Sequence, residues 1–551
     1  MQQARQVRSA QLPPFVRAML QPAFYPHRPA RVRLVQTHIS WVFIAGDRVY
    51  KLKKPVDFGF LDFSTPRKRA QACRREVELN RRLAPGLYLG VVAIHEHRSS
   101  GTDFKSVPIG DRVPVPGSAP FPDRRYSLRP PGRVVEHAVV MRLLPDERLL
   151  SSLLARRAVD AADLRRIARR IAAFHAAARE ASPRWRRVAV LEENLRENFR
   201  QTVPFLGKTV SGGDYLLIWD YNHDFLVRRR ALLERRARTG RIRDGHGDLH
   251  AEHVCVEGSQ VRIYDCIEFS DRLRQCDVAA DIAFLYMDLL HHRRPDLATA
   301  LMEEYLRRTG DWEVRLLVPF YACYRAVVRE KVESFRLADP GITAARKRAA
   351  SRRAASYFQL ARELARRDAR PRLFLVGGLP GSGKSTVARA LADRLGAECI
   401  VSDVLRKDLA GAEPGAKLAA AVGAGIYETS MSELTYRELL VQAERTMLAG
   451  HSVVLDATFG RAIQRRRAAA LARAVGGVLV EVECRCPARI TRERLAARSR
   501  PGYAGPSDAG WEVYRALRRT FAPFGPDTVR IDTTCPLERC LARIAERAYP
   551  L

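Results

Sequence analysis

The sequence predicts two domains of different classes: an α+β domain of two lobes, followed by an α/β domain with a doubly wound parallel sheet. The chain has 551 residues, too many for one hydrophobic core, and its 46% hydrophobic content is ordinary for a folded protein. Strand-like runs cluster near the start, and helical patterns follow them. From residue 373 onward, short apolar strands alternate with helices, which is typical of a parallel sheet with helices on both faces.

Shifts in composition place the boundaries between these parts. Residues 342–370 are rich in Arg and Ala and carry an apolar stripe, so we expect a helix with a solvated basic face between the domains. The expected segments are an N-terminal lead-in at 1–30, the two-lobed domain at 31–340, a helical connector at 341–370 and the α/β domain at 371–545.

The first domain should open with a small sheet. Gly46-Asp47 lies between two strand-like runs and predicts a hairpin turn. A short connector and several helices follow the last strand, which is the element order of a kinase-like bilobal domain. The expected strands are 32–35, 41–45, 49–53, 88–94 and 134–144, with a helix at 66–83 and a loop insertion at 96–132.

A glycine-rich loop opens the α/β domain. Residues 378–385 spell G-x-x-x-x-G-K-S between an apolar strand and a helix, which is the order of a P-loop NTPase. Such a loop turns its backbone N–H groups toward phosphate, its Lys reaches the β- and γ-phosphates, and its Ser binds Mg²⁺. We therefore expect ATP and Mg²⁺ as cofactors. The predicted nucleotide-binding residues are Gly378, Gly381, Ser382, Gly383, Lys384, Ser385 and Thr386, and Ser385 is also a predicted metal ligand.

Charged residues that follow the glycine-rich loop are further candidates for the site of the α/β domain. Asp456 ends another apolar strand, where a Walker B-type carboxylate stands, so it is a candidate group on the metal side. Residues 370–545 resemble small P-loop kinases of the zeta-toxin, gluconate kinase and polynucleotide 5′-kinase kind, within the AAA family ATPases. By that resemblance, D-x-x-R makes Asp403 the candidate general base and Arg406 a substrate clamp. Arg494 and Arg498 look like lid arginines that stabilise the transferred phosphoryl group.

Two of these assignments have simpler alternatives. Asp403 could instead be the N-cap of the helix that follows it. Arg494 and Arg498 are four residues apart on a helix, and such a pair arises easily in a chain this rich in arginine.

A second acidic pair lies in the first domain. His246-Gly247-Asp248-Leu249-His250 should lie on a loop, and Asp265 ends the strand after it. Two carboxylates at such turns suit phosphoryl transfer, one as base and one as metal ligand. The stretch resembles the aminoglycoside phosphotransferase family over about residues 30–340, with its H-G-D-x-H-x-x-N motif. The resemblance implies that Asp248 is the catalytic base, that Asp265 binds the metal and that Glu268 closes the second motif.

The same resemblance assigns the nucleotide side of the first domain. Lys51 looks like the strand lysine that binds the α- and β-phosphates, and Glu76 looks like its ion-pair partner on the next helix. Lys53 is the alternative, because alternate residues of a strand share one face.

One position departs from the family pattern. The Asn that binds magnesium should fall at 253, and this chain has His253 there. A neutral imidazole is a poorer ligand for Mg²⁺ than a carboxamide oxygen. Three interpretations stay open: the metal is held by Asp265 and water, His253 acts in an altered site with another divalent ion, or this half binds a ligand without transferring phosphate.

The composition of the chain indicates which kinds of binding partner to expect. The formal net charge is +34, but only 11 of the 95 basic residues are Lys and the Arg are spread along the whole chain. This charge permits nucleic acid as a partner without favouring it. No apolar run reaches 18 residues, so we expect no membrane partner and a cytoplasmic protein. The ten cysteines form no CxxC pair, which argues against a zinc site.

These observations favour an ATP-dependent phosphotransferase with two candidate nucleotide sites that acts on the hydroxyl group of a small molecule. One alternative is a nucleotide-regulated ATPase or binding protein whose kinase-like domain is not catalytic. Another is a nucleic-acid 5′-kinase, whose binding to single strands would weaken steeply with salt.

Overall fold

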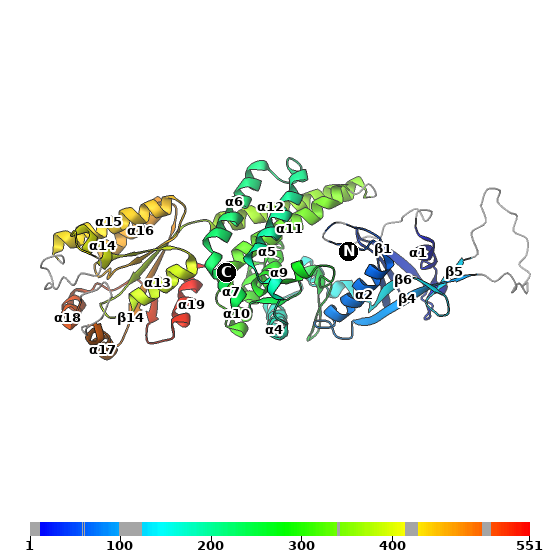
Figure 1. Cartoon of the computed structure of the whole chain (residues 1–551), viewed down its shortest axis with the longest axis horizontal. Coiled ribbons are helices and arrows are strands. Elements are labelled where there is room, and N and C mark those ends of the chain that lie inside the picture. The colour runs from blue at the N-terminus through cyan, green and yellow to red at the C-terminus, as the bar shows by residue number, and fades with distance from the viewer. Residues whose placement is uncertain are drawn as a thin grey trace, which may run out of the picture. The chain divides into compact units, whose positions relative to one another are not determined.

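The computed structural model describes residues 12–57, 59, 61–98, 124–338, 342–413, 428–498 and 509–550 (Figure 1). The chain divides into two units. Unit 1 comprises residues 1–181 and 243–276, and unit 2 comprises residues 182–242 and 277–551. These two units do not test the domain boundaries predicted from the sequence, which stay a prediction. Residues 1–11 of the expected lead-in, and residues 99–123 of the expected loop insertion, lie outside the described residues.

Unit 1 contains a six-stranded antiparallel sheet in the order β1-β2-β3-β6-β4-β5. Strand β3 lies between β2 and β6, so Lys51 pairs with Val42 on one side and Val139 on the other. The core on one face includes Phe43 and Leu52, both fully buried. The strands are β1 (Val32–Gln36), β2 (Ser40–Ala45), β3 (Arg48–Lys53), β4 (Tyr88–Arg98), β5 (Arg124–Ser127) and β6 (Arg133–Arg142).

The sheet extends further than expected. Strand β4 continues to Arg98 and pairs with β5, which lies inside the stretch predicted as a loop insertion. The side chains of the two strands interact, since the Tyr126 hydroxyl donates to Glu96 at 3.1 Å. The prediction of a loop over 124–127 is therefore wrong, because cross-strand pairing supplies the order that this short polar run lacks by itself.

Helix α2 (Pro66–Asn80) packs against β6 and β4. The Thr65 side chain accepts from the Lys68 N–H and caps it, and Pro66 occupies its first turn. Its buried face includes Cys73 and Val77, as an amphipathic helix requires. Glu76 is also buried on this helix, and a buried carboxylate needs a cationic partner.

The rest of unit 1 consists of short elements around a β-hairpin. Strands β8 and β9 form the hairpin, and the residues after β9 carry Asp265. The remaining elements are α1 (Pro14–Ala18), η2 (Pro22–Phe24), η3 (Asp146–Arg148), α3 (Leu150–Ala155), α4 (Ala161–Ala177), β7 (Ile242–Asp244), η6 (Ala251–His253), β8 (Val254–Glu257), β9 (Gln260–Ile263), α8 (Asp271–Arg274) and β10 (Gln275–Asp277).

Unit 2 begins with helices. Helix α9 is buried at every residue from Val278 to Leu289, so it forms a helical core. Helix α12 confirms the helix expected near 342–370, and it packs along α11. These elements are η4 (Pro183–Trp185), α5 (Val188–Thr202), η5 (Val203–Phe205), α6 (Gly212–Arg228), α7 (Arg230–Arg238), α9 (Val278–His291), α10 (Pro295–Thr309), α11 (Val314–Ala338) and α12 (Ala344–Asp368).

The C-terminal part of unit 2 is the predicted α/β domain. Its five strands are all parallel, in the order β12-β13-β11-β14-β15. Helices α15 and α16 cover one face, and α13 and α19 lie on the other (Figure 1). The elements are β11 (Arg372–Gly377), α13 (Lys384–Leu395), β12 (Glu398–Val401), α14 (Ser402–Leu409), α15 (Thr429–Leu448), β13 (Val453–Asp456), α16 (Ala462–Ala474), β14 (Val478–Arg485), α17 (Ala488–Arg498), α18 (Trp511–Thr520), β15 (Val529–Asp532) and α19 (Leu537–Ala548).

The doubly wound sheet is therefore confirmed, and its carboxyl edge is where ligands bind in this architecture. None of the described helices is both long enough and apolar enough to cross a bilayer.

Candidate functional site

The glycine-rich loop joins β11 to α13. Gly383 is the N-cap of α13 and has a φ of +85°. Gly378 has a φ of +146°, and a Cβ there would lie 2.6 Å from the carbonyl oxygen of Cys484. The loop can therefore follow this course only with glycine at 378. Helix α13 begins at Lys384, so its first N–H groups face the loop, which is the geometry that binds phosphate.

A lysine and a carboxylate are buried beside the loop. Lys384 is 8% exposed and Asp456 is 1% exposed. Asp456 ends β13, in register with Val376 on β11. Burial raises the pKa of Asp456, and Lys384 and the Ser385 hydroxyl oppose that shift. Both Asp456 carboxylate oxygens lack a hydrogen-bond partner of normal geometry among the described residues. Such a carboxylate beside the Ser385 hydroxyl fits Mg²⁺, which prefers oxygen ligands.

Asp403 lies in the first turn of α14. The N-cap of that helix is Val401 and no side chain caps it, so the alternative role of Asp403 as N-cap is not observed. Instead, Asp403 Oδ1 lies 3.0 Å from Arg406 Nη1. Asp403 also helps to raise the pKa of Asp456, so the two carboxylates are neighbours at the same sheet edge. The ion pair holds this partly exposed carboxylate in place, and its role as general base stays a prediction.

Arg494 on α17 lies against the loop. Its Nη1 donates to the Thr533 hydroxyl at 3.0 Å and its Nη2 donates to the Thr533 carbonyl at 2.9 Å. Thr533 in turn donates to the Ser382 carbonyl at 2.6 Å. A Cβ on Gly383 would lie 3.1 Å from Arg494 Nη1. The structure thus places Arg494 at the loop, whereas the role of Arg498, at the end of the same helix, stays a prediction.

A second cluster of charges lies in unit 1. Lys51 Nζ is 2.6 Å from Asp265 Oδ1 and 2.9 Å from Glu76 Oε1. Lys53 Nζ is 2.5 Å from Glu76 Oε2 and also binds Glu268. Both lysines point to the same face of β3, as the strand period requires. Lys51 contacts Asp265, and Lys53 is fully buried between the two glutamates. Which of the two lysines binds phosphate stays a prediction.

Opposite charges dominate this cluster. Burial lowers the pKa of Lys51, but Asp265 and Glu76 outweigh it and raise that pKa well above its usual value. Burial raises the pKa of Asp265, but Lys51 outweighs it and holds that pKa low. Burial raises the pKa of Glu268, and Lys53 only partly opposes it. Two lysines face three carboxylates, so the ionised cluster has one negative charge in excess and could accept a cation.

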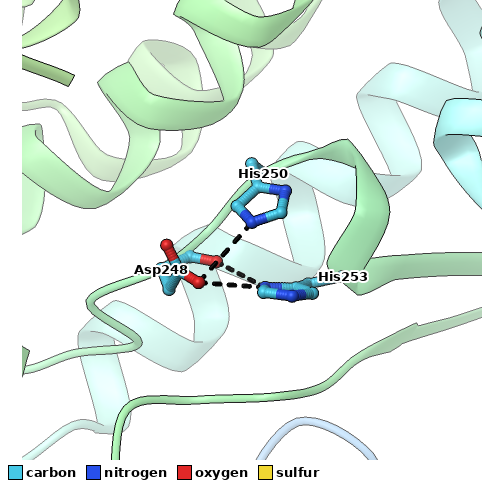
Figure 2. A group of neighbouring side chains, drawn as sticks. All are labelled: Asp248, His250 and His253. Carbon is cyan, nitrogen blue, oxygen red and sulfur yellow. Dashed lines mark hydrogen bonds and ion pairs between the residues drawn. The ribbon is translucent and has the colours of Figure 1, made fainter. Parts of the chain in front are cut away.

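Three side chains of the loop after β7 gather beside this cluster. Asp248, His250 and His253 point toward one another (Figure 2). His250 Nε2 and His253 Nδ1 each lie 3.5 Å from Asp248 Oδ2. His253 Nε2 lies 3.5 Å from Asp265 Oδ2. His253 therefore stands between the predicted base and the predicted metal ligand.

The protonation of His253 bears on which metal fits here. Burial lowers its pKa, and His250 lowers it further, so the ring is neutral near pH 7. A neutral imidazole nitrogen does not fit Mg²⁺ as a ligand, whereas the Asp265 carboxylate does. The carboxylate oxygens of Asp265 and Asp248 therefore fit Mg²⁺ at this site, and His253 does not.

Sequence reasoning missed several residues beside these sites. The Tyr88 hydroxyl accepts from the Asp265 backbone N–H at 3.2 Å. The Tyr436 hydroxyl accepts from the Phe459 N–H at 3.0 Å, and burial raises the Tyr436 pKa to about 12. Thr533 holds Arg494. Only Thr533 had a usable signal, because it follows the last parallel strand and so lies at the ligand-binding edge of the sheet.

Comparisons with known proteins match this chain over different lengths. A family model described as "AAA domain" matches residues 373–524. The Shikimate kinase of Mycobacterium tuberculosis (strain ATCC 25177 / H37Ra) is 35% identical over 165 residues, which cover 30% of this chain and 84% of that protein. A solved structure of a choline/ethanolamine kinase family protein from Mesorhizobium loti covers 64% of this chain and 98% of its own, at 13% identity and a TM-score of 0.35.

A mycobacterial relative matches nearly the whole chain. Uncharacterized protein Rv2004c of Mycobacterium tuberculosis (strain ATCC 25618 / H37Rv) is 33% identical over 515 residues, which cover 92% of this chain and 93% of that protein. Uncharacterized protein Mb2027c of Mycobacterium bovis matches to the same extent. The chain therefore belongs to the same family as these mycobacterial proteins, and its C-terminal part is a P-loop kinase-like domain.

Proposed function

We propose that this protein is an ATP-dependent phosphotransferase that moves the γ-phosphoryl group of ATP to a hydroxyl group of a small molecule. One observation carries the proposal. The carboxyl edge of the parallel sheet brings together a phosphate loop with Lys384, a buried carboxylate at Asp456 with unpartnered oxygens, and Asp403 held by Arg406. A small acceptor is supported by the mycobacterial relative of this domain, whose name gives shikimate as its substrate.

Each residue of this edge has a role in the proposal. The loop N–H groups and Lys384 bind the phosphates, and Arg494 neutralises charge on the transferred group from its place beside Gly383. Ser385 and Asp456 would hold Mg²⁺, which supplies further charge neutralisation at the phosphates. Asp403 accepts the proton of the acceptor hydroxyl, and Arg406 keeps that carboxylate in place.

Unit 1 is proposed as a second nucleotide site, of the aminoglycoside phosphotransferase kind. Lys51, paired with Glu76, would bind the α- and β-phosphates, and Asp248 would accept the acceptor's proton. A second candidate function has a specific observation behind it. Lys51 and Lys53 are enclosed by three carboxylates and His253 replaces the family Asn, which favours a unit 1 that binds without transferring phosphate. That protein would be a nucleotide-regulated ATPase.

The deciding experiment is ATP turnover by the full chain with Mg²⁺, against a panel of sugars, nucleosides, shikimate, aminoglycosides and oligonucleotides. An acceptor that speeds turnover supports the phosphotransferase, and Asp403→Asn should remove that acceleration. Asp408→Asn, on the same helix as Asp403, is the matched control and should keep it. Slow hydrolysis that no hydroxyl compound accelerates would favour the regulated ATPase. Acceleration by oligonucleotides alone would favour the nucleic-acid 5′-kinase.

A further inference from the structure

A group of metal-ligating side chains lies at the C-terminal end of helix α9 in unit 2. Asp288 and His291 belong to the last turn of the helix, and His292 is its C-cap. One carboxylate oxygen of Asp288 and one ring nitrogen of each histidine all lie within 4.8 Å of one another. Residues three and four apart share one face of a helix, so this spacing brings the three side chains together. The group shares no residue with either candidate nucleotide site.

The carboxylate of this group is buried and is held by helix α12. Asp288 is 2% exposed, and its Oδ1 accepts from the Tyr357 hydroxyl at 3.0 Å. Tyr357 is itself buried, and the Arg329 guanidinium lies over its ring. A hydrogen bond from a neighbouring residue orients the carboxylate, as it does for carboxylates that bind metals.

The ring of His291 is fixed in a way that leaves one nitrogen for a ligand. It stacks on Tyr357, with ring centroids 3.7 Å apart and planes at 12°. Its Nε2 lies 2.8 Å from Ser356 Oγ. Its Nδ1 is buried and has no hydrogen-bond partner among the described residues. Buried polar atoms are nearly always paired, so this nitrogen lacks an interaction that a metal ion would supply.

The separation of the three atoms is close to that of ligands around one ion. Two ligand atoms about 2.1 Å from an ion, at a tetrahedral angle, lie about 3.4 Å apart. Small rotations of the side chains are enough to reach that separation. His292 lies at the helix end and is partly exposed, so its ring can make most of this adjustment.

We propose that Asp288, His291 and His292 form a binding site for Zn²⁺. Two imidazole nitrogens and one carboxylate oxygen are a ligand set that Zn²⁺ takes in proteins, and water would fill the fourth position. Mg²⁺ is disfavoured here, because it selects oxygen ligands. Since Tyr357 and Ser356 belong to α12, a bound ion would strengthen the contact between α9 and α12 within the helical part of unit 2. The inference is independent of the proposed phosphotransferase activity.

The test reads the position of the ion in the wild-type full chain. The protein is freed of metal with EDTA, and Zn²⁺ is titrated against a chromophoric chelator. At each step the histidines are modified with diethyl pyrocarbonate, and the modified peptides are identified by mass spectrometry. We expect Zn²⁺ to protect His291 and His292 at one equivalent. His223, an exposed histidine on α6 of the same unit, should stay reactive.

A conservative variant tests whether Asp288 is a ligand. Tyr357→Phe keeps the ring that stacks on His291 and removes only the hydroxyl that donates to Asp288. We expect it to lower the Zn²⁺ affinity of the protected site by about tenfold, which is typical for loss of a hydrogen bond to a metal ligand. Tyr221→Phe is the matched control, because it removes a similar bond from a tyrosine hydroxyl to Asp368, 2.9 Å long, and should leave the affinity unchanged.

A second variant removes a ligand outright. His292→Asn should lower the Zn²⁺ affinity by more than about tenfold and end the protection of His291 at one equivalent. If Zn²⁺ leaves both histidines reactive in the wild type, or protects only His250 and His253 of unit 1, the inference is overturned.

Equal Zn²⁺ affinities of Tyr357→Phe and Tyr221→Phe would overturn the assignment of Asp288 as a ligand. Protection is read in the wild-type protein, so a variant that failed to fold would leave the conclusion about the two histidines intact.

Discussion

The two candidate sites use the same residue types in opposite electrostatic states. In unit 2, Lys384 makes no ion pair within the described part of the chain, and Asp456 is buried without a hydrogen-bond partner of normal geometry there. In unit 1, Lys51 is bound by two carboxylates, and its partner Asp265 carries a lowered pKa. The phosphate loop therefore offers its cation to a ligand, whereas both lysines of the unit 1 cluster are already paired with carboxylates.

This difference indicates which site contributes mainly to the stability of the protein and which is prepared to bind a ligand. A buried lysine between carboxylates fixes local structure, and removing one partner leaves an uncompensated charge. A buried carboxylate without a partner costs stability, and it persists where a ligand later supplies the missing interaction. We therefore expect mutations in unit 1 to act mainly on folding, and mutations around the phosphate loop to act mainly on nucleotide binding and turnover.

The largest effect should come from Glu76. This carboxylate is fully buried and contacts both Lys51 and Lys53, so Glu76→Gln leaves the two lysines without their shared partner. We expect the free energy of unfolding of unit 1 to fall by about 3–5 kcal/mol, measured by urea denaturation. The control is Glu78→Gln on the same helix, whose exposed ion pair with Arg75 should be worth less than about 1 kcal/mol. Equal effects of the two variants would contradict a stabilising cluster.

The next largest effect should distinguish Lys384 from Lys51 in their contribution to ATP turnover. Lys384→Ala should lower ATP turnover by about 100-fold or more, because a fixed positive charge at the phosphates is lost. Lys51→Ala should lower it by less than about threefold, because turnover is assigned to the phosphate loop. Lys208→Ala, an exposed lysine of unit 2, is the control. A loss as large in Lys51→Ala as in Lys384→Ala would place the chemistry in unit 1.

The phosphate loop was predictable because its chemistry is local. The residues from Gly378 to Ser385 are contiguous, and the strand and helix around them follow from apolar pattern alone. The face shared by Lys51 and Lys53 was predictable for the same reason, since a strand has a period of two.

The partners in unit 1 were not predictable in detail, because they meet across long sequence separations. Lys51 and Asp265 are 214 residues apart, and which carboxylate each lysine takes depends on how β3 and the β8–β9 hairpin are placed. The link from Thr533 to Ser382, 151 residues away, was missed for the same reason. Strand β5 was missed because four polar residues next to a proline-rich stretch carry no strand signal without their partner strand.

A smaller effect should appear at Asp456 and have the opposite sign to that at Glu76. Burial raises the Asp456 pKa, so the ionised form costs stability at pH 7, and Asp456→Asn should raise the free energy of unfolding by about 1–2 kcal/mol. Thermal unfolding without nucleotide measures this. The same variant should lose the stabilisation that ATP and Mg²⁺ give the wild type. Asp393→Asn, exposed on α13, should change neither, and a destabilised Asp456→Asn would contradict the unpartnered state of this carboxylate.

The smallest effect concerns pH. It tests whether substitutions of Asp265 and Asp456 change the free energy of unfolding in opposite directions as pH falls. Lys51 lowers the Asp265 pKa, so its contribution to stability is present above the unfolded value of about 3.9 and is lost as pH falls through and below it. The Asp265 side chain is 37% exposed, and solvent screening limits the loss in Asp265→Asn to about 1 kcal/mol at pH 7.

Urea unfolding in EDTA between pH 7 and pH 4 gives the comparison. The destabilisation caused by Asp265→Asn should shrink as pH falls toward 4, because the wild-type carboxylate in the unfolded chain begins to bind a proton there. The stabilisation caused by Asp456→Asn should also shrink, because the buried wild-type carboxylate is neutralised as pH falls through its raised pKa. The two variants thus approach the wild type from opposite sides, and profiles that move in the same direction would show that the two sites do not differ in the way their contacts indicate.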